Sequence, residues 1–391
     1  MDRQLRAPAG ARSGFMSVGA ALVVVVLAFA LAACGSGDDS TSAASRQTST
    51  GSGGSGDSST AAAQAAIAPL LEKPTLFPVT EPLKKLPKGA TIAYMDFGSP
   101  ISALQYQLLL PAAKTMGVKI ARIKAGPDAK TVATGFDAAV QMKPDAVIVS
   151  AQDIDLWKNQ LKQLQDLKVP IVTTGVSGAD KYGIKATAAG DASNQLAGEL
   201  LGDYTVAKME PSDVVVYQVP EISFSRQIAD NVVAQIKSRC PQCSVRTANV
   251  AAATLGNTAP NTIVSDLQAH PKTKTAVFVL YEMAAGLPAA MRGGGIKVQT
   301  LGYAPGPAQF QDIKDGKLTA TLAYDLPVNM WTLLDMAARQ IGGQELSGPS
   351  AEGKGVIQFL TQKDITFDPS KGWTGYPDFP ARFAKLWGVK G

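Results

Sequence analysis

The sequence predicts an α/β fold of two doubly wound parallel sheets. Apolar strand-like runs alternate with amphipathic helical stretches from Thr91 onward. Strand starts near 91, 118, 145 and 169 recur about every 25–27 residues, which is the size of a βα unit in a parallel sheet. The alternation starts again after Asp191, so we expect a second array of similar size.

The predicted strands are almost continuously apolar, as expected when helices cover both faces of a sheet. In the first array we expect strands at 91–95, 118–123, 146–150 and 169–174, separated by helices at 102–116, 129–141 and 154–167. In the second we expect helices at 194–208, 225–239, 260–269 and 283–291, alternating with strands at 214–217, 244–248, 275–280 and 297–302. A strand at 318–324 and a helix at 328–341 then precede an irregular, aromatic-containing tail.

The beginning of the chain has the pattern of a secretory signal. Three arginines precede an uncharged stretch over 16–30, which leads into Leu31-Ala32-Ala33-Cys34. This run resembles the lipobox of bacterial lipoproteins, in which the cysteine is diacylated before cleavage. The resemblance implies a signal peptide over 1–33 and a body outside the cytoplasm, anchored to the cell membrane by a lipid on Cys34. The alternative is a retained membrane anchor, since the apolar stretch is near the lower limit for crossing a bilayer.

The next segment, 34–66, is mostly Gly, Ser, Thr, Ala and Asp, so we expect a disordered tether. Without 1–33 the chain has 34 basic and 31 acidic side chains, a balance too even to indicate a nucleic-acid partner. The apolar content of 46% supports a globular body, and the 325 residues that remain after the tether, 67–391, are enough for two domains.

Several local runs, taken in order, resemble the type I periplasmic substrate-binding proteins of ABC importers, and in particular the ribose- and galactose-binding group. They are Ile92-Ala93-Tyr94 leading into Gly98-Ser99-Pro100, Lys143-Pro144-Asp145-Ala146-Val147-Ile148, Val169-Pro170-Ile171-Val172, Ala269-His270-Pro271-Lys272 with Glu282-Met283-Ala284-Ala285-Gly286, and Asp315-Gly316-Lys317-Leu318. The resemblance covers about 89–345 and leaves the tail unassigned.

This resemblance implies lobes that are discontinuous in sequence. Lobe 1 would contain 89–189 and 326–344, and lobe 2 would contain 190–325 and the tail 345–391. The chain would cross between the two parallel-sheet lobes near 190, 325 and 345, so the resemblance implies a three-strand hinge. Ligands of open α/β sheets bind beyond the carboxyl ends of the strands, so the expected site is the cleft between the lobes. Closure about the crossings would trap the ligand.

Candidate ligand contacts are residues just past the predicted strand ends, where aromatic faces hold apolar surface and a few polar groups fix orientation. The strongest is Arg226, at a place where the sugar-binding relatives carry an arginine; its alternative is a solvated helix charge. For the aromatic candidates the alternative is ordinary core packing. The candidates are Asp96, Phe97, Ser99 and Thr174 in lobe 1, and Phe224, Arg226, Tyr281, Tyr303 and Tyr324 in lobe 2.

Three departures from the sugar-binding pattern bear on the ligand. Thr174-Gly175, Leu280-Tyr281 and Ala304 stand where the sugar binders carry polar groups that pair with hydroxyls. A buried hydroxyl without a partner costs roughly 1–3 kcal/mol. We therefore expect a solute that is less hydroxylated than a simple pentose or hexose, of aromatic or amphipathic character.

The cysteines and the single histidine argue against catalysis and cofactors. Cys240 and Cys243 follow a predicted helix, whose C-terminal dipole opposes a reactive thiolate, so we expect a local structural disulfide in an exported protein. His270 is the only histidine, which excludes ordinary histidine-assisted catalysis and leaves too few ligands for a metal site. No cofactor is expected.

The function predicted from these features is capture of a small solute and its delivery to an ABC-type membrane permease. One alternative is a sensor that docks on a membrane receptor, because its lobes would look the same in sequence. A less favoured one is an exported enzyme, which turnover of a bound ligand would reveal.

Overall fold

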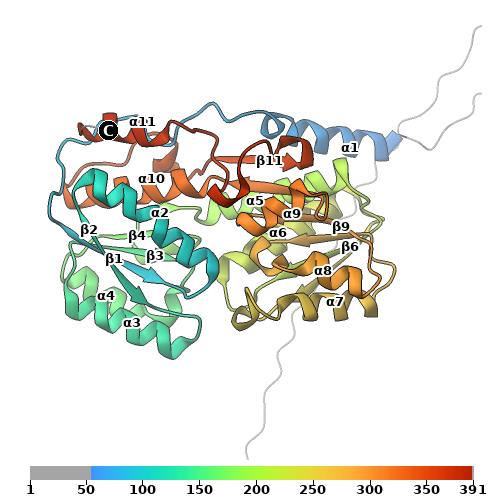
Figure 1. The fold of residues 1–391 in the computed structure, drawn as a ribbon, viewed down its shortest axis with the longest axis horizontal. Helices are drawn as coiled ribbons and strands as arrows, with labels where there is room; N and C mark the ends of the chain where they lie inside the picture. The colour runs from blue at the N-terminus through green and yellow to red at the C-terminus, as the bar shows by residue number, and fades with distance from the viewer. Residues whose placement is uncertain (1–53, 390–391) are drawn as a thin grey trace, which may run out of the picture. The chain divides into compact units, whose positions relative to one another are not determined.

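The computed structural model describes residues 54–389 and contains the two predicted parallel-sheet lobes, each covered by helices (Figure 1). The predicted signal, Cys34 and the first part of the predicted tether lie outside the described residues. Within the described chain, no helix has the length and apolarity needed to cross a membrane.

Lobe 1 is built on a five-stranded parallel sheet of order β2-β1-β3-β4-β5. Two helices cover each face, as alternate side chains of β1 point into two separate apolar clusters. The elements are β1 (Thr91–Asp96), α2 (Pro100–Met116), β2 (Lys119–Lys124), α3 (Ala129–Met142), β3 (Ala146–Ser150), α4 (Lys158–Asp166), β4 (Ile171–Thr174), β5 (Ala186–Ala188) and α10 (Leu326–Ile341).

Lobe 2 has a six-stranded sheet of order β11-β10-β9-β8-β6-β7, in which only β11 is antiparallel to its neighbour. Its buried strands are runs of Val, Ala, Leu and aromatic residues, as expected for a covered sheet. The elements are α5 (Asp191–Lys208), β6 (Asp213–Gln218), α6 (Ser223–Arg239), β7 (Ser244–Asn249), α7 (Ala259–Ala269), β8 (Thr275–Phe278), α8 (Leu287–Gly293), β9 (Gln299–Tyr303), α9 (Pro307–Lys314), β10 (Ala320–Tyr324) and β11 (Ile357–Thr361).

Helix α2 shows how the sequence fixes one element beside the site. The Ser99 hydroxyl accepts a hydrogen bond from the Ser102 backbone N–H, and Pro100 occupies the first helical position, where its missing N–H costs nothing. The helix ends at Gly117, whose φ of 79° is the left-handed conformation that glycine adopts without strain. The N-terminus of α2 is thereby set directly after the carboxyl end of β1.

The prediction of a disordered tether is wrong for residues 54–66. Residues 54–66 belong to helix α1 (Gly54–Ile67), which packs on α5 of lobe 2. Ala63 and Ile67 are fully buried there. A composition rich in Gly, Ser and Ala predicts disorder in isolation, but the alanines let this helix approach α5 closely, and packing supplies its stability.

The expectation that the whole tail, 345–391, belongs to lobe 2 is wrong. Strand β11 does pair with β10 of lobe 2, but helix α11 (Phe379–Trp387) packs on lobe 1, where Trp387 stacks on Trp331 of α10 at 5.3 Å. The segment before β1 also crosses between the lobes, from α1 to lobe 1. The chain therefore passes between the lobes five times, and the three predicted crossings are among them (Figure 1).

Candidate functional site

A cavity of about 90 Å³ lies between the two lobes. Its walls include residues that follow the carboxyl ends of strands in both sheets, which is where open α/β sheets bind ligands. Lobe 1 contributes Phe97 after β1, Ala151 after β3 and Gly175 after β4. Lobe 2 contributes Leu280 after β8 and Ala304 after β9.

Six of the nine predicted ligand contacts line this cavity. Aromatic rings come from both lobes, with Phe97 in lobe 1 and Phe224 in lobe 2, and the Tyr303 and Tyr324 rings are 6.1 Å apart. Gly175 lies against Phe224, because a Cβ at that position would come within 3.4 Å of the ring. The six residues are Phe97, Ser99, Thr174, Phe224, Tyr303 and Tyr324.

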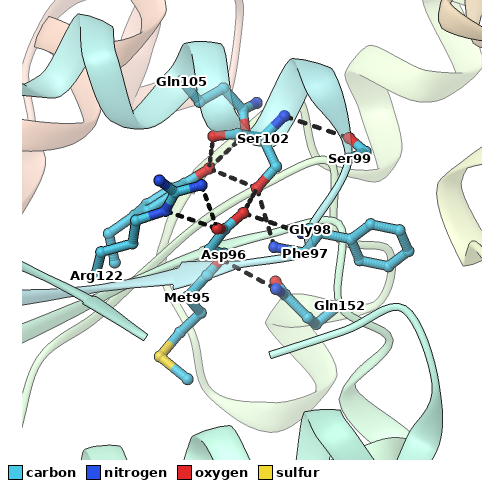
Figure 2. Close-up of polar contacts among 10 residues, drawn as sticks. Met95, Asp96, Phe97, Gly98, Ser99, Ser102, Gln105, Arg122 and Gln152 are labelled. Carbon is cyan, nitrogen blue, oxygen red and sulfur yellow. Dashed lines mark hydrogen bonds and ion pairs between the residues drawn. The ribbon is translucent and has the colours of Figure 1, made fainter. Parts of the chain in front are cut away.

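Asp96 does not line the cavity, because other side chains occupy its carboxylate. The Ser102 hydroxyl and the Gly98 N–H donate hydrogen bonds to it, and Arg122 forms an ion pair with it at 2.7 Å (Figure 2). Burial acts to raise the pKa of Asp96, but these hydrogen bonds and the guanidinium hold it below its usual value. Figure 2 shows the Phe97 ring pointing away from this network, so Asp96 anchors the loop that presents Phe97.

Tyr281 and Arg226 also lie outside the cavity lining. Tyr281 is fully buried beneath β9, where Gly302 leaves room for its ring and Thr300 accepts from its hydroxyl at 3.3 Å. Arg226 is on the rim, where it donates to the Pro220 carbonyl and faces Asp153 of lobe 1 at 3.5 Å. Tyr281 therefore belongs to the core of lobe 2, and Arg226 belongs to a contact between the lobes.

The lining includes six polar residues that the strand-end rule did not select, two of which are Ser102 and Ser150. Gln105 and Asn329 lie on helices α2 and α10, and Asn194 is on α5. Glu282 belongs to the Glu-Met-Ala run that we had used only as a family signature. Its place two residues after a candidate strand end was the one sequence signal that could have found it.

Glu282 joins the lobes across the cavity. Its side chain is in lobe 2, and its Oε1 accepts a hydrogen bond from the Ile101 N–H at the start of α2 at 2.9 Å. The residue is only 5% exposed. Burial raises the pKa of Glu282, while the hydrogen bonds from Ile101 and Ser99 act in the opposite direction. Together with the Arg226–Asp153 pair and a 2.8 Å hydrogen bond from Ser177 to Gln227, it holds the lobes closed over the cavity.

The residues around the cavity do not form a metal site. In residues 54–389 no group of three or more His, Cys, Asp or Glu side chains is arranged to hold a metal ion. The Cys240–Cys243 disulfide is present, and it lies after the C-terminus of α6, as the sequence suggested.

Tyr324 borders the cavity with its ring pressed against a glycine. A Cβ at Gly355 would lie 2.3 Å from Cε2 of Tyr324, so we expect Gly355→Ala to push the ring into the cavity. Overpacking of this kind costs roughly 1–3 kcal/mol, and we expect ligand affinity to fall by at least about 10-fold in a calorimetric titration. The control is Gly293→Ala, whose new Cβ has nothing within 4 Å. Equal affinities for the two variants would refute this role of Gly355.

Two parallel-sheet lobes closed over a shared cavity define a bilobal solute-binding protein. The chain belongs to the periplasmic binding protein domain family, whose model matches residues 99–345. This is a family of binding proteins rather than enzymes, in agreement with the sequence-based prediction. The predicted α/β fold with two parallel-sheet lobes is also confirmed.

Solved structures with the same fold share little sequence with the chain. A carbohydrate transporter from Acidothermus cellulolyticus 11B, in complex with myo-inositol, is 17% identical with a TM-score of 0.62, over 76% of this chain and 99% of its own. A periplasmic solute-binding protein from Actinobacillus succinogenes 130Z, with bound D-allose, is 18% identical with a TM-score of 0.60, over 71% and 99%. A chain of the XylFII-LytSN complex is 14% identical with a TM-score of 0.62, over 71% and 99%. A comparison with curated proteins gives no match.

Proposed function

We propose that the protein is an extracytoplasmic solute-binding lipoprotein that traps a small molecule between its lobes and delivers it to an ABC-type permease. The observation that carries this proposal is the cavity at the carboxyl ends of two parallel sheets, lined by both lobes and closed by side chains that reach across. Such a cavity buries a ligand only when the lobes come together, so closure reports occupancy to a partner.

The lipobox-like run Leu31-Ala32-Ala33-Cys34 supports the membrane attachment in this proposal. Lipid on Cys34 would tether the body through the segment before α1, and α1 itself packs on lobe 2. The body would thus stay near its permease and remain free to collect solute.

The ligand we propose is a small sugar-like or less hydroxylated solute. Two of the structural neighbours were solved with myo-inositol and D-allose, which supports a small sugar or cyclic polyol as the starting point of a search. The apolar walls at Ala151, Leu280 and Ala304 support a ligand with fewer hydroxyl groups than these two compounds.

The proposal is tested by screening the full-length chain against sugars, polyols, purines and aromatic acids. We expect at least one ligand to release heat in calorimetry and to make the protein more compact in small-angle scattering. A ligand that is turned over to a product, or a screen with neither heat nor compaction, would contradict the proposal.

The second candidate is a sensor whose closed form binds a membrane receptor. One structural neighbour is a chain of the XylFII-LytSN complex, so a chain with this fold can be part of a protein complex. A pull-down from membranes with ligand-closed protein separates the two functions, because a permease and a receptor would be recovered as different partners.

A further inference from the structure

Several polar side chains of the cavity are already hydrogen-bonded within the protein. Oε1 of Gln105 accepts from the hydroxyls of Tyr94 and Ser150, both at 2.8 Å. The Ser102 hydroxyl donates to Asp96 and accepts from the Phe97 N–H. A ligand with many hydroxyl groups would have to compete for partners that are taken.

The same holds on the opposite side of the cavity. Nδ2 of Asn194 donates to Oε1 of Gln227 at 3.1 Å, and Nδ2 of Asn329 donates to the Thr174 hydroxyl at 3.3 Å. These two hydrogen bonds each join side chains within one lobe, so the donors involved are not available to a solute.

Among the described residues of the lining, the hydroxyls of Tyr303 and Tyr324 make no hydrogen bond, and only that of Tyr324 is closed off from solvent. The Tyr324 hydroxyl is buried and has no hydrogen-bond partner, although the residue is only 8% exposed and borders the cavity. Burial raises the pKa of the Tyr324 phenol, and the nearby Thr174 hydroxyl acts in the opposite direction. No hydrogen bond of ordinary geometry joins the two hydroxyls. A buried hydroxyl without a partner is costly, and a ligand acceptor at this point would remove the cost.

The charged side chains of the cavity lining narrow the class of ligand further. Among residues 54–389, Glu282 is the only acidic side chain that lines the cavity, and no Lys, Arg or His of this part of the chain lines it. An anion would meet a carboxyl group and no cation. A cation would find that carboxyl group already accepting the hydrogen bond from Ile101 at the start of α2.

The closed cavity is also small. A volume of about 90 Å³ corresponds to roughly six water-sized spheres, which leaves room for about one ring. Its aromatic walls suit the faces of such a ring.

We propose that the cavity selects an uncharged, mostly apolar compound of about one ring that carries a single hydrogen-bond acceptor, and that Tyr324 donates to this acceptor. This inference rests on the proposed function and specifies its ligand class.

Four compounds with the same six-membered carbon ring test the proposal: cyclohexanone, cyclohexylammonium, cyclohexanecarboxylate and myo-inositol. In calorimetric titrations of the full-length chain we expect cyclohexanone to bind at least about 10-fold more tightly than each of the other three, because only it is uncharged, mostly apolar and limited to a single acceptor. Tyr324→Phe should weaken cyclohexanone about 5-fold and leave the affinity for cyclohexane unchanged, since only the hydroxyl is removed.

The outcomes separate the two proposals. If myo-inositol binds as tightly as cyclohexanone, the ligand class is wrong while the solute-binding function stands. The ligand class is also overturned if either charged ring binds more tightly than cyclohexanone, or if no ring binds. It is overturned as well if Tyr324→Phe weakens the binding of cyclohexane as much as that of cyclohexanone. The binding function itself fails if the broad solute screen described above is also silent, or if a ligand in it is turned over to a product.

Discussion

Replacing Asp335 with alanine should destabilise the folded protein by about 3–5 kcal/mol, because it leaves a buried guanidinium without its counter-ion. Asp335 and Arg339 lie one turn apart on α10, pair at 2.6 Å, and their side chains are each only 1% exposed. Asp335 also accepts from the indole N–H of Trp387 at 2.9 Å, and Arg339 donates to the Glu81 carbonyl. The pair thus joins α10 to α11 and to the segment before β1.

The chain offers a matched control on its surface. Asp378 and Arg382 are also one helical turn apart and pair at 2.9 Å, but their side chains are 58% and 43% exposed. Asp378→Ala should cost no more than about 1 kcal/mol in urea denaturation, as exposed pairs do. A second check is Asp335→Ala combined with Arg339→Met, which removes the stranded charge and should recover much of the loss. Equal losses for the two single variants would contradict this account.

The lobes were predictable because each βα unit has its own local signal. Strand β3, with five consecutive buried residues, and helix α3, capped by Asp128, follow from patterns within 20 residues of chain. The return of the tail to lobe 1 has no such signal. Trp387 meets Trp331 and Asp335 only after 52 residues or more of intervening chain, and an aromatic, amphipathic segment gives no indication of which apolar surface it will cover.

The site was predictable only in part, for a geometric reason. The strand-end rule locates a position along the chain, but it does not fix where the side chain points. Phe97 projects away from the Asp96 network, whereas the neighbouring Asp96 turns toward Arg122 (Figure 2). Gln105 and Asn329 enter the cavity from helices, to which the rule does not apply.

The largest pH effect is expected at Asp325, which joins three crossings between the lobes. Its backbone N–H donates to the Val356 carbonyl, and its carboxylate accepts from Val328 N–H, Thr374 Oγ1 and Gly375 N–H at 3.0, 2.9 and 2.8 Å. The residue is 1% exposed, and no Lys, Arg or His in residues 54–389 pairs with it. Burial raises the pKa of Asp325 from 3.8 to about 7, against the effect of these hydrogen bonds.

A raised pKa means that the folded protein binds this proton more tightly than the unfolded chain does. Between pH 3.8 and about 7 the folded state therefore holds more protons, and stability falls as the pH rises through that window. Outside the window the group contributes no slope, because both states are then protonated or both ionised. Each unit of pKa difference corresponds to about 1.4 kcal/mol, so the upper limit of the loss is on the order of 4 kcal/mol.

Asp325→Asn isolates this titration, since the amide keeps the shape and carries no charge. In urea denaturation, the advantage of the native protein over Asp325→Asn should shrink steadily from pH 4 to pH 7. Asp368 gives a control of opposite sign, because hydrogen bonds from Ser370 lower the pKa of this exposed carboxyl, and its contribution to stability is lost as the pH falls. A difference between native protein and Asp325→Asn that stays constant with pH would mean that Asp325 is held ionised throughout. The three crossings would then be joined by a permanent buried charge, and the lobes would move about a hinge insensitive to pH.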